Sequence, residues 1–208
     1  MLTPYHIEIC RHALDSTFSP EALNIIIAAN LAQDGLRGLV GHPEYHFDNN
    51  AFEAGCAYME AQRQIILESI NMSSEIKIAW EAFGKLTHAA QDFYAHSNYV
   101  SLWVRTHRQT ELPPPAKMKA LQSEILNHPD FCSGKVYLWD WLAFVPGLHE
   151  LAKHLLPLDS HTHMNLDSPN QGPMFPYAYQ AAVKRTILEY EQIIQGFDKT
   201  SLTRFKGY

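Results

Sequence analysis

One segment, between residues 73 and 96, constrains the fold of this chain most strongly. Within it His88, Asp92 and His96 follow one another four residues apart. An α-helix turns by about 100° per residue, so these three side chains lie within about 80° of one another on its surface. The segment predicts a long helix, starting near residue 73 and continuing past Tyr94, that carries one row of ligand-type side chains.

This row of side chains has two interpretations: a solvated polar stripe, or a metal site that faces a lined cavity. Two imidazoles and a carboxylate on one stripe can hold one ion. They can bridge two ions if the carboxylate lies between the imidazoles, and Asp92 has that central position. The residues around the row favour the cavity because they are apolar or aromatic. They are Trp80, Phe83, Leu86, Phe93, Tyr94 and Trp103.

Start and stop signals along the rest of the chain predict an all-α protein. Pro4 follows Thr3 and Pro20 follows Ser19, which is the pattern of an N-cap before a first helical turn. No hairpin dipeptide separates alternating runs, so strand signals are weak. We predict long loops over 35–50 and 158–173. The other predicted helices cover 4–14, 21–33, 51–69, 115–127, one or two stretches within 135–156, and 175–195.

Composition limits the class of protein further. A chain of 208 residues with 46% hydrophobic residues can bury a core, and we expect a single domain over 1–208. The net charge of −6 argues against a surface that binds duplex DNA. The three cysteines form no CxxC pair, and no signal peptide or membrane span is apparent, so we expect a cytoplasmic location. Twelve histidines against 16 lysines and arginines point to imidazole chemistry.

A zinc ion usually has four protein ligands, or three and a water molecule, so other segments must add to the row on the helix. Each candidate also has a structural interpretation. His6 is a ligand or a core histidine, Asp34 a ligand or a turn residue, and Asp167 a ligand or a cap of the following turn. The candidates outside the helix are His6, Asp34, His46, His161, His163 and Asp167.

The segment GKLTHAAQDFYAHSNYV resembles the helix signature of the zinc-dependent phospholipase C and single-strand-nuclease superfamily. It is most similar to the branch related to the fungal heterokaryon-incompatibility (Het-C) proteins, whose pattern is like LTHxxQDFYxHSNW, and Tyr99 alone departs from it. His6, Asp34, the His46-Phe-Asp segment and the segment 160–169 occur in the order expected for this superfamily. The resemblance implies an all-α helical bundle with a cluster of two or three zinc ions in a cleft.

Carried over residue by residue, the resemblance also implies which residues bind each ion. A third ion would take His6, with Asp92 as a bridge to the first. The secreted enzymes of the superfamily add the amino group of an N-terminal Trp to this third ion, where the present chain has Met1. The first ion would take Asp34, His46, His88 and Asp92.

The second ion would take His96 and a histidine from the predicted loop 158–173, with Asp167 completing the site. Two histidines of this loop are candidates for that ligand. The secreted enzymes show a His-x-x-x-acid pattern, which selects His163, whereas the Het-C-like branch points to His161. We prefer His161 and keep His163 as the alternative.

The implied chemistry is that of a metal-dependent hydrolase of phosphoric esters. Zinc ions lower the pKa of a bound water and hold a phosphodiester, and Asp34 would accept the proton of that water as the catalytic residue. The substrate would be a phospholipid or a single-stranded nucleotide, and manganese or iron could replace zinc. The alternative is a non-catalytic, metal-containing Het-C-like module that acts through contact with proteins or, transiently, with a membrane surface. The oligomeric state stays open.

Overall fold

The computed structural model consists of α-helices and short 3-10 helices arranged around one central helix, α6 (Ile76–His96). It describes residues 1–208 apart from 36–37, 39–40, 71, 73–75, 108–110 and 141–153. Within that part of the chain there is no β-strand, only two isolated bridges, Ser97 with Ser133 and Lys135 with Ser160. The predicted all-α fold is therefore confirmed.

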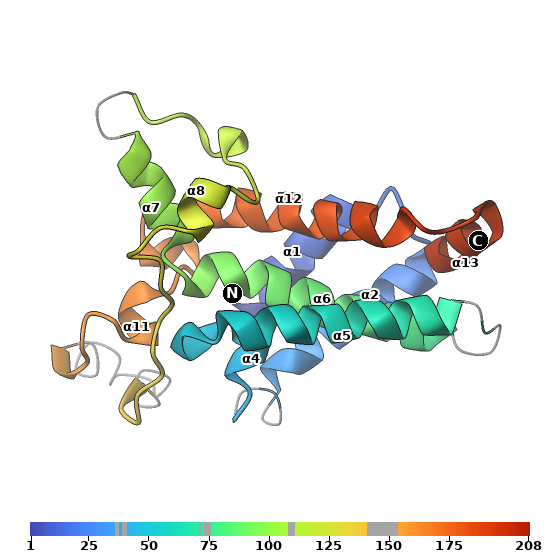
Figure 1. The fold of residues 1–208 in the computed structure, drawn as a ribbon, viewed down its shortest axis with the longest axis horizontal. Helices are drawn as coiled ribbons and strands as arrows, with labels where there is room; N and C mark the ends of the chain where they lie inside the picture. The colour runs from blue at the N-terminus through green and yellow to red at the C-terminus, as the bar shows by residue number, and fades with distance from the viewer. Residues whose placement is uncertain (36–37, 39–40, 71, 73–75, 108–110, 141–153) are drawn as a thin grey trace.

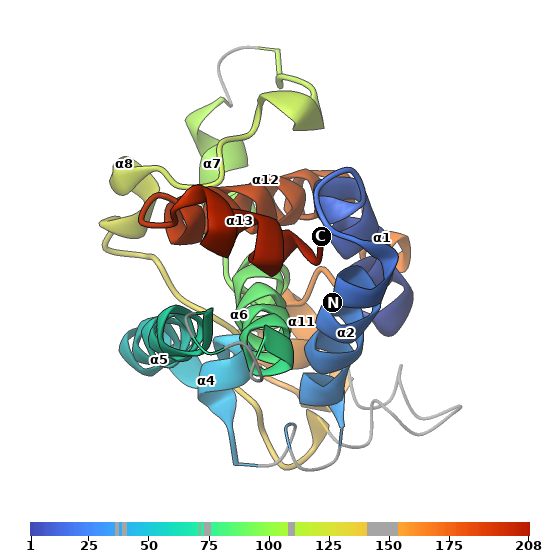
Figure 2. The same ribbon diagram turned by 90° about the vertical axis from the view of Figure 1, so that its right-hand side faces the viewer.

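Four long helices surround α6. They are α1 (Thr3–Leu14), α2 (Pro20–Leu31), α5 (Phe52–Ile70) and α12 (Phe175–Ile194). In Figure 1, α5 and α12 run lengthwise beside α6. Seen from the end in Figure 2, α6 lies in the middle, with α12 above it, α5 on one side and α1 and α2 on the other. Every residue from Leu86 to His96 is buried in consequence, so the ligand row is not a solvated stripe.

A glycine allows α2 to approach α6 closely. A Cβ atom on Gly84 would lie 2.2 Å from the carbonyl oxygen of Ile26 and 2.8 Å from the Cβ of Ala29. Because only a residue without a Cβ fits there, the two backbones pack directly against each other. The close approach brings Asn30 of α2 within hydrogen-bonding distance, 3.2 Å, of the Thr87 hydroxyl on α6.

The first two helices begin with proline in the first turn, as the sequence predicts. The Ser19 hydroxyl accepts a hydrogen bond from the backbone N–H of Ala22 at 3.3 Å and caps α2. The N-cap of α1 differs from the prediction. Helix α1 already includes Thr3, so Leu2 occupies the cap position and provides no side-chain hydrogen bond.

Both predicted long loops contain short helices. The first loop, 35–50, includes α4 (Pro43–His46) and η2 (Asp48–Asn50), and η1 (Ala32–Asp34) precedes it. The second loop, 158–173, includes α11 (His161–Met164) and η4 (Pro169–Gln171). The single helix predicted over 115–127 was wrong: extended chain separates η3 (Pro115–Lys117) from α8 (Ser123–Leu126). Helix α7 (Tyr99–Thr106) follows α6 directly.

The C-terminal helix α13 (Lys199–Lys206) was not predicted. Its N-cap, Asp198, accepts a hydrogen bond from the backbone N–H of Ser201 at 2.7 Å. The indole N–H of Trp80 donates to the carbonyl oxygen of Phe205 at 2.7 Å, which fastens α13 to α6. One hydrophobic core thus extends from Ile9 of α1 to Phe205 of α13.

Two sequence predictions fall on residues outside the described part of the chain. They are the helix start at one of the serines 73 and 74, and most of the helical stretch within 135–156, of which the described residues 135–139 are not helical. Among the helices that the structure describes, none combines the length and the apolar character needed to cross a bilayer. The cytoplasmic location and the single-domain organisation stay predictions.

Candidate metal centre

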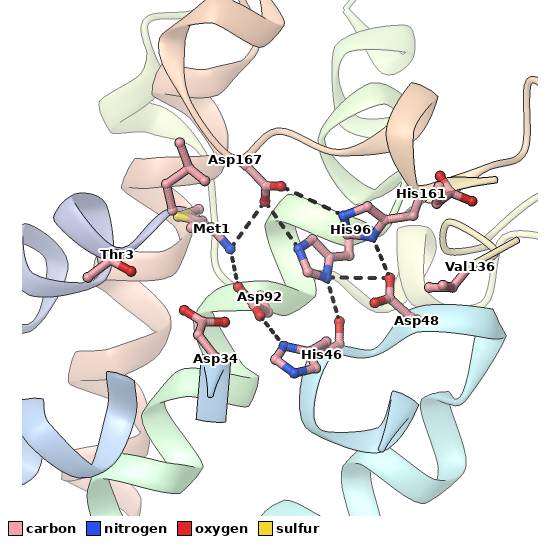
Figure 3. Close-up of a pocket in the computed structure, with 12 residues that line it drawn as sticks. Met1, Thr3, Asp34, His46, Asp48, Asp92, His96, Val136, His161 and Asp167 are labelled. Atoms are coloured by element: carbon pink, nitrogen blue, oxygen red, sulfur yellow. Dashed lines mark hydrogen bonds and ion pairs between the residues drawn. The ribbon is translucent and has the colours of Figure 1, made fainter. Parts of the chain in front are cut away.

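A cavity of about 310 Å³ opens beside the C-terminal half of α6. Figure 3 shows its carboxylates and imidazoles pointing toward one another from α6, from the turn after α4, and from α11 and the loop that follows it. Neither lysine nor arginine lines the described part of this cavity, although five aspartates do. Its polar lining residues are Thr3, Asp34, His46, Asp48, Asp92, His96, Asp140, His161 and Asp167.

The first cluster consists of His6, Asp34, His88 and Asp92, each of which offers one ligand atom within 4.8 Å of the others. The His88 Nε2 atom lies 3.1 Å from Asp92 Oδ2 and 3.6 Å from Asp34 Oδ1. The His6 Nε2 atom lies 3.2 Å from Asp92 Oδ1 and 3.9 Å from Asp34 Oδ2. Both imidazoles therefore face both carboxylates, which is a donor set suited to a divalent ion.

His46 borders the first cluster from the end of α4. Its Nδ1 atom lies 2.8 Å from Asp92 Oδ2 and 3.1 Å from His88 Nε2. Its carbonyl oxygen lies 3.0 Å from Nδ1 of His96, which belongs to the neighbouring cluster. One residue therefore contacts both groups of candidate ligands through different atoms.

Burial and the charge of Asp92 act in opposite directions on the pKa of His88 and of His46, and in the same direction on that of Asp34. Burial lowers the pKa of His88 to about 3, despite the opposing effect of Asp92. Burial and the nearby Asp92 raise the pKa of Asp34. For His46, burial lowers the pKa but the hydrogen bond and charge of Asp92 outweigh it, so its pKa is raised. His88 is thus neutral at ordinary pH, the form in which imidazole binds metals.

The second cluster consists of Asp48, His96 and His161, with Asp167 beside it. Asp48 Oδ1 lies 3.0 Å from His161 Nδ1 and 3.4 Å from His96 Nδ1. On the other edge of the two rings, Asp167 Oδ1 lies 3.1 Å from His96 Nε2, and Asp167 Oδ2 lies 3.8 Å from His161 Nε2. The two imidazoles thus lie between two carboxylates, as the dashed lines of Figure 3 show in part.

The carboxylates dominate the charge balance of the second cluster. Burial lowers the pKa of His161, but Asp48 and Asp167 outweigh this effect and hold the pKa well above its ordinary value. Burial raises the pKa of Asp48, but His96 and His161 outweigh it and the pKa is lowered. A metal ion that binds His161 would therefore displace a proton from its ring.

A strained turn presents Asp48 to this cluster. Phe47, Asn49 and Asn50 all have left-handed backbone conformations, with φ near 57°. Such conformations are costly for a bulky residue such as Phe47, and strained turns of this kind are found at functional sites. The Phe47 ring packs where Gly55 has no side chain: a Cβ on Gly55 would lie 2.5 Å from it.

The 130–136 segment joins the three chain regions that carry the second cluster. The N–H of Gly134 donates to the carbonyl oxygen of His96 at 2.9 Å, and its carbonyl oxygen accepts from the N–H of Asn49 at 2.8 Å. The N–H of His161 donates to the carbonyl oxygen of Lys135 at 2.8 Å. A Cβ on Gly134 would lie 2.8 Å from the Cα of His161, so only glycine fits at this crossing.

The structure brings together all the predicted ligand residues except His163. His161 points into the cavity, whereas His163 lies outside both clusters on the same short helix, α11. Asp48 was missed as a ligand, although its place two residues after His46 was a signal that could have found it. The amino nitrogen of Met1 contacts Asp92 and lies 3.2 Å from Asp167 Oδ1. The ligand roles themselves, and the catalytic role of Asp34, stay predictions.

Fold and site together define the class: an all-helical domain with a buried histidine–aspartate centre. The chain belongs to the VWA7 N-terminal domain family, whose profile matches residues 6–133. The matched region contains the whole first cluster and, of the second, Asp48 and His96. No solved structure matches the chain.

Three relatives carry the name von Willebrand factor A domain-containing protein 7. The rat protein (Rattus norvegicus) is 36% identical over 85 residues, 40% of this chain. The mouse protein (Mus musculus) is 35% identical over 85 residues, again 40% of this chain, and the human protein (Homo sapiens) is 35% identical over 82 residues, 39% of it. The aligned part of the chain spans only 9% of the length of each relative.

These findings correct the identification made from the sequence. The resemblance to the phospholipase C and nuclease superfamily, and to its Het-C-like branch, was wrong, because the matching family and relatives are those of VWA7. The predicted phosphoric-ester hydrolase and its enzyme class were therefore also wrong. The signature that suggested them consists of candidate ligands and core residues of α6. Such residues are enough to predict a helix and a site, but the reaction at a site depends on the other groups that surround it.

Proposed function

We propose that this domain is a module that binds two divalent metal ions, one at each cluster, and uses them to fasten its helices together. Zinc is the preferred ion because both clusters combine imidazole and carboxylate ligands, and manganese or iron are alternatives. The first cluster offers two imidazoles and two carboxylates. The second offers two imidazoles and Asp48, with Asp167 within reach of the same rings.

The observation that carries this proposal is a buried ring nitrogen without a hydrogen-bond partner that faces two carboxylates of the cavity. The Nε2 atom of His6 faces Asp34 and Asp92 at 3.9 and 3.2 Å, is fully buried, and makes no hydrogen bond. Buried polar atoms are nearly always satisfied, so an orphaned nitrogen aimed at two carboxylates fits a missing cation. A metal ion bound there would give the His6 nitrogen and the two carboxylates a common partner.

Charge balance supports the same proposal. Buried carboxylates are stable only when they are paired or bind a metal. Four aspartates face the imidazoles, and beside the ammonium group of Met1, which contacts Asp92 and Asp167, divalent ions would supply further positive charge for them. These aspartates are Asp34, Asp48, Asp92 and Asp167.

The ions would have a structural role. The first cluster joins α1 and α6 to the end of α2 through η1, and the second joins α6 to η2 and α11. Metal ligation contributes directly to the free energy of folding when the ligands come from separate elements. The predicted partners, namely a phosphoric ester, a transient membrane contact and no duplex DNA, stay predictions.

Metal analysis of a matched pair of variants tests the proposal. We expect two zinc ions per wild-type chain and at most one in Asp92→Asn, because Asp92 contacts His6, His46 and His88. The control, Asp15→Asn, changes an exposed aspartate at the end of α1 and should keep both ions. Zinc at a thousandfold excess over its Kd should stabilise the wild type by about 4 kcal/mol. A wild-type domain that retains no zinc, manganese or iron after dialysis would overturn the proposal.

A further inference from the structure

A network of buried polar side chains contacts the first cluster through His6. It joins four helices: α1, α2, α6 and α12. None of its side chains has any solvent exposure, so bulk water cannot satisfy their hydrogen bonds. Apart from His6, its members belong to neither cluster. They are His6, Asn30, Thr87, Gln91 and Thr186.

The two threonines fix the directions of the hydrogen bonds. The Thr186 hydroxyl donates its proton to the carbonyl oxygen of Ala182 at 2.9 Å, and the Thr87 hydroxyl donates to that of Gly84 at 2.8 Å. Each hydroxyl has one proton, so toward the rest of the network both can only accept. The group that faces Thr186 at 3.2 Å must therefore be the NH₂ of Gln91.

With its NH₂ group directed at Thr186, Gln91 presents its carbonyl oxygen to His6. This orientation agrees with Asn30, whose NH₂ group donates to Gln91 Oε1 at 3.3 Å and to the Thr87 hydroxyl at 3.2 Å. His6 Nδ1 lies 2.6 Å from the same Gln91 oxygen. Because a carbonyl oxygen has no proton to give, Nδ1 of His6 must carry one.

The position of that proton decides what His6 offers to the cavity. In a neutral imidazole with a proton on Nδ1, Nε2 has a free lone pair. That lone pair points at the carboxylates of Asp34 and Asp92, which have lone pairs of their own. A metal ion between this nitrogen and the two carboxylates would turn the facing lone pairs into shared ligands.

We infer that Gln91 is a positioning residue that holds His6 with its proton on Nδ1, so that Nε2 is presented to the first cluster as a metal ligand. The inference rests on the proposed metal binding and adds to it the residue that selects the ligating atom. Partners that orient ligand histidines typically contribute 10- to 100-fold in metal affinity. Gln91 also holds α1 in place, because its contact to His6 joins α1 to α6.

The test compares three variants by zinc affinity, in competition with a chelating dye, and by ¹⁵N NMR of the histidine rings. We expect Gln91→Leu to lose the Nδ1 protonation of His6 and to bind zinc at the first cluster about 10- to 100-fold more weakly. Gln91→Glu keeps an acceptor oxygen and should retain both properties. Gln62→Leu is the matched control, because it removes a buried glutamine of α5 outside both clusters.

If Gln91→Leu does not fold, Thr186→Val replaces it, since that change leaves Gln91 free to rotate its amide and should give a smaller loss in the same direction. His6 of the wild type could prove to be protonated on Nε2 before metal is added, while zinc binding is normal. That outcome would overturn the role of Gln91 but not the metal binding. Absence of metal from the wild type would overturn the metal proposal, and with it any role of Gln91 toward a metal. Equal affinities and ring spectra of Gln91→Leu and the wild type would also contradict the inference.

Discussion

The two clusters lie side by side but are built in different ways. The first draws His6, His88 and Asp92 from long helices and is enclosed by the buried network around Gln91. The second draws Asp48 and His161 from short elements that the 130–136 segment joins by backbone hydrogen bonds. Side chains on packed helices are held more precisely than side chains on turns. We therefore expect the first cluster to be the rigid half of the centre and the second the adaptable half.

Each half depends on one glycine at a close crossing, so a substitution at that glycine can disturb one half of the centre at a time. Gly84 lies where α2 meets α6, and Gly134 lies where the 130–136 segment meets His161. In both places an added methyl group would meet backbone atoms that cannot move out of the way as a flexible side chain could.

Gly84→Ala should have the largest effect. The added Cβ would lie 2.2 Å from the carbonyl oxygen of Ile26, so α2 must separate from α6 and carry Asn30 away from Thr87. Overpacking of a core lowers the free energy of unfolding by about 1 to 3 kcal/mol. We expect the upper end of this range because the added Cβ clashes with a backbone atom. Urea unfolding measures the loss. Gly196→Ala is the control, because nothing lies within 4 Å of its added Cβ, and equal stability of the two variants would contradict the prediction.

Gly134→Ala should affect the second cluster and spare the first. Its Cβ would lie 2.8 Å from the Cα of His161 and displace α11, at a cost of about 1 to 2 kcal/mol. We expect the variant to bind one zinc ion per chain in place of two, with the ring signals of His6 and His88 unchanged in NMR spectra. Loss of both ions together would show that the clusters are a single unit.

Acidification should empty the second cluster before the first. The pKa of His161 is held well above its ordinary value by Asp48 and Asp167, whereas burial lowers that of His88 to about 3. As the pH falls, protons therefore compete with metal at His161 while His88 is still neutral. Zinc release followed with a colorimetric chelator should show two steps, and His161→Gln should lack the step at higher pH. A single step with the same midpoint in both proteins would contradict this order.

Cysteine labelling gives the smallest but most local readout. Cys10 is fully buried beside Gln91, and burial raises its pKa to about 11. Cys132 lies in the 130–136 segment, is partly exposed, and has a pKa raised mainly by burial. Iodoacetamide followed by mass spectrometry should label exposed Cys56 first, Cys132 later and Cys10 only on global unfolding. Labelling of Cys10 at the rate of Cys132 would show that the first half is no more rigid than the second.

The sequence predicted the central helix well because its signal is local. His88, Asp92 and His96 share one face through helical periodicity alone, and their apolar neighbours indicated burial. The meeting of His6 with Asp34 and Asp92 depends on how α1 and α2 pack against α6, which no spacing encodes. This meeting was predicted only from the resemblance to a family to which the chain does not belong.

The two missed details, Asp48 and helix α13, and the preference for His161 over His163 have separate physical explanations. Left-handed conformations at Phe47 and Asn49 turn the chain so that Asp48 faces His161, and a left-handed phenylalanine cannot be foreseen from sequence. The choice of His161 over His163 depends on Ser160, whose hydroxyl caps α11 and thereby sets which residue faces the cavity. Helix α13 had signals that could have been used, Asp198 as its cap and Gly207 as its end.

The 130–136 segment also contains the end of the match to the family profile. The matched region ends at Ser133, one residue before Gly134, so His161 and Asp167 belong to the part of the chain that the family profile does not cover. The second cluster of this chain is therefore assembled across that point, from Asp48 and His96 before it and from His161 and Asp167 after it.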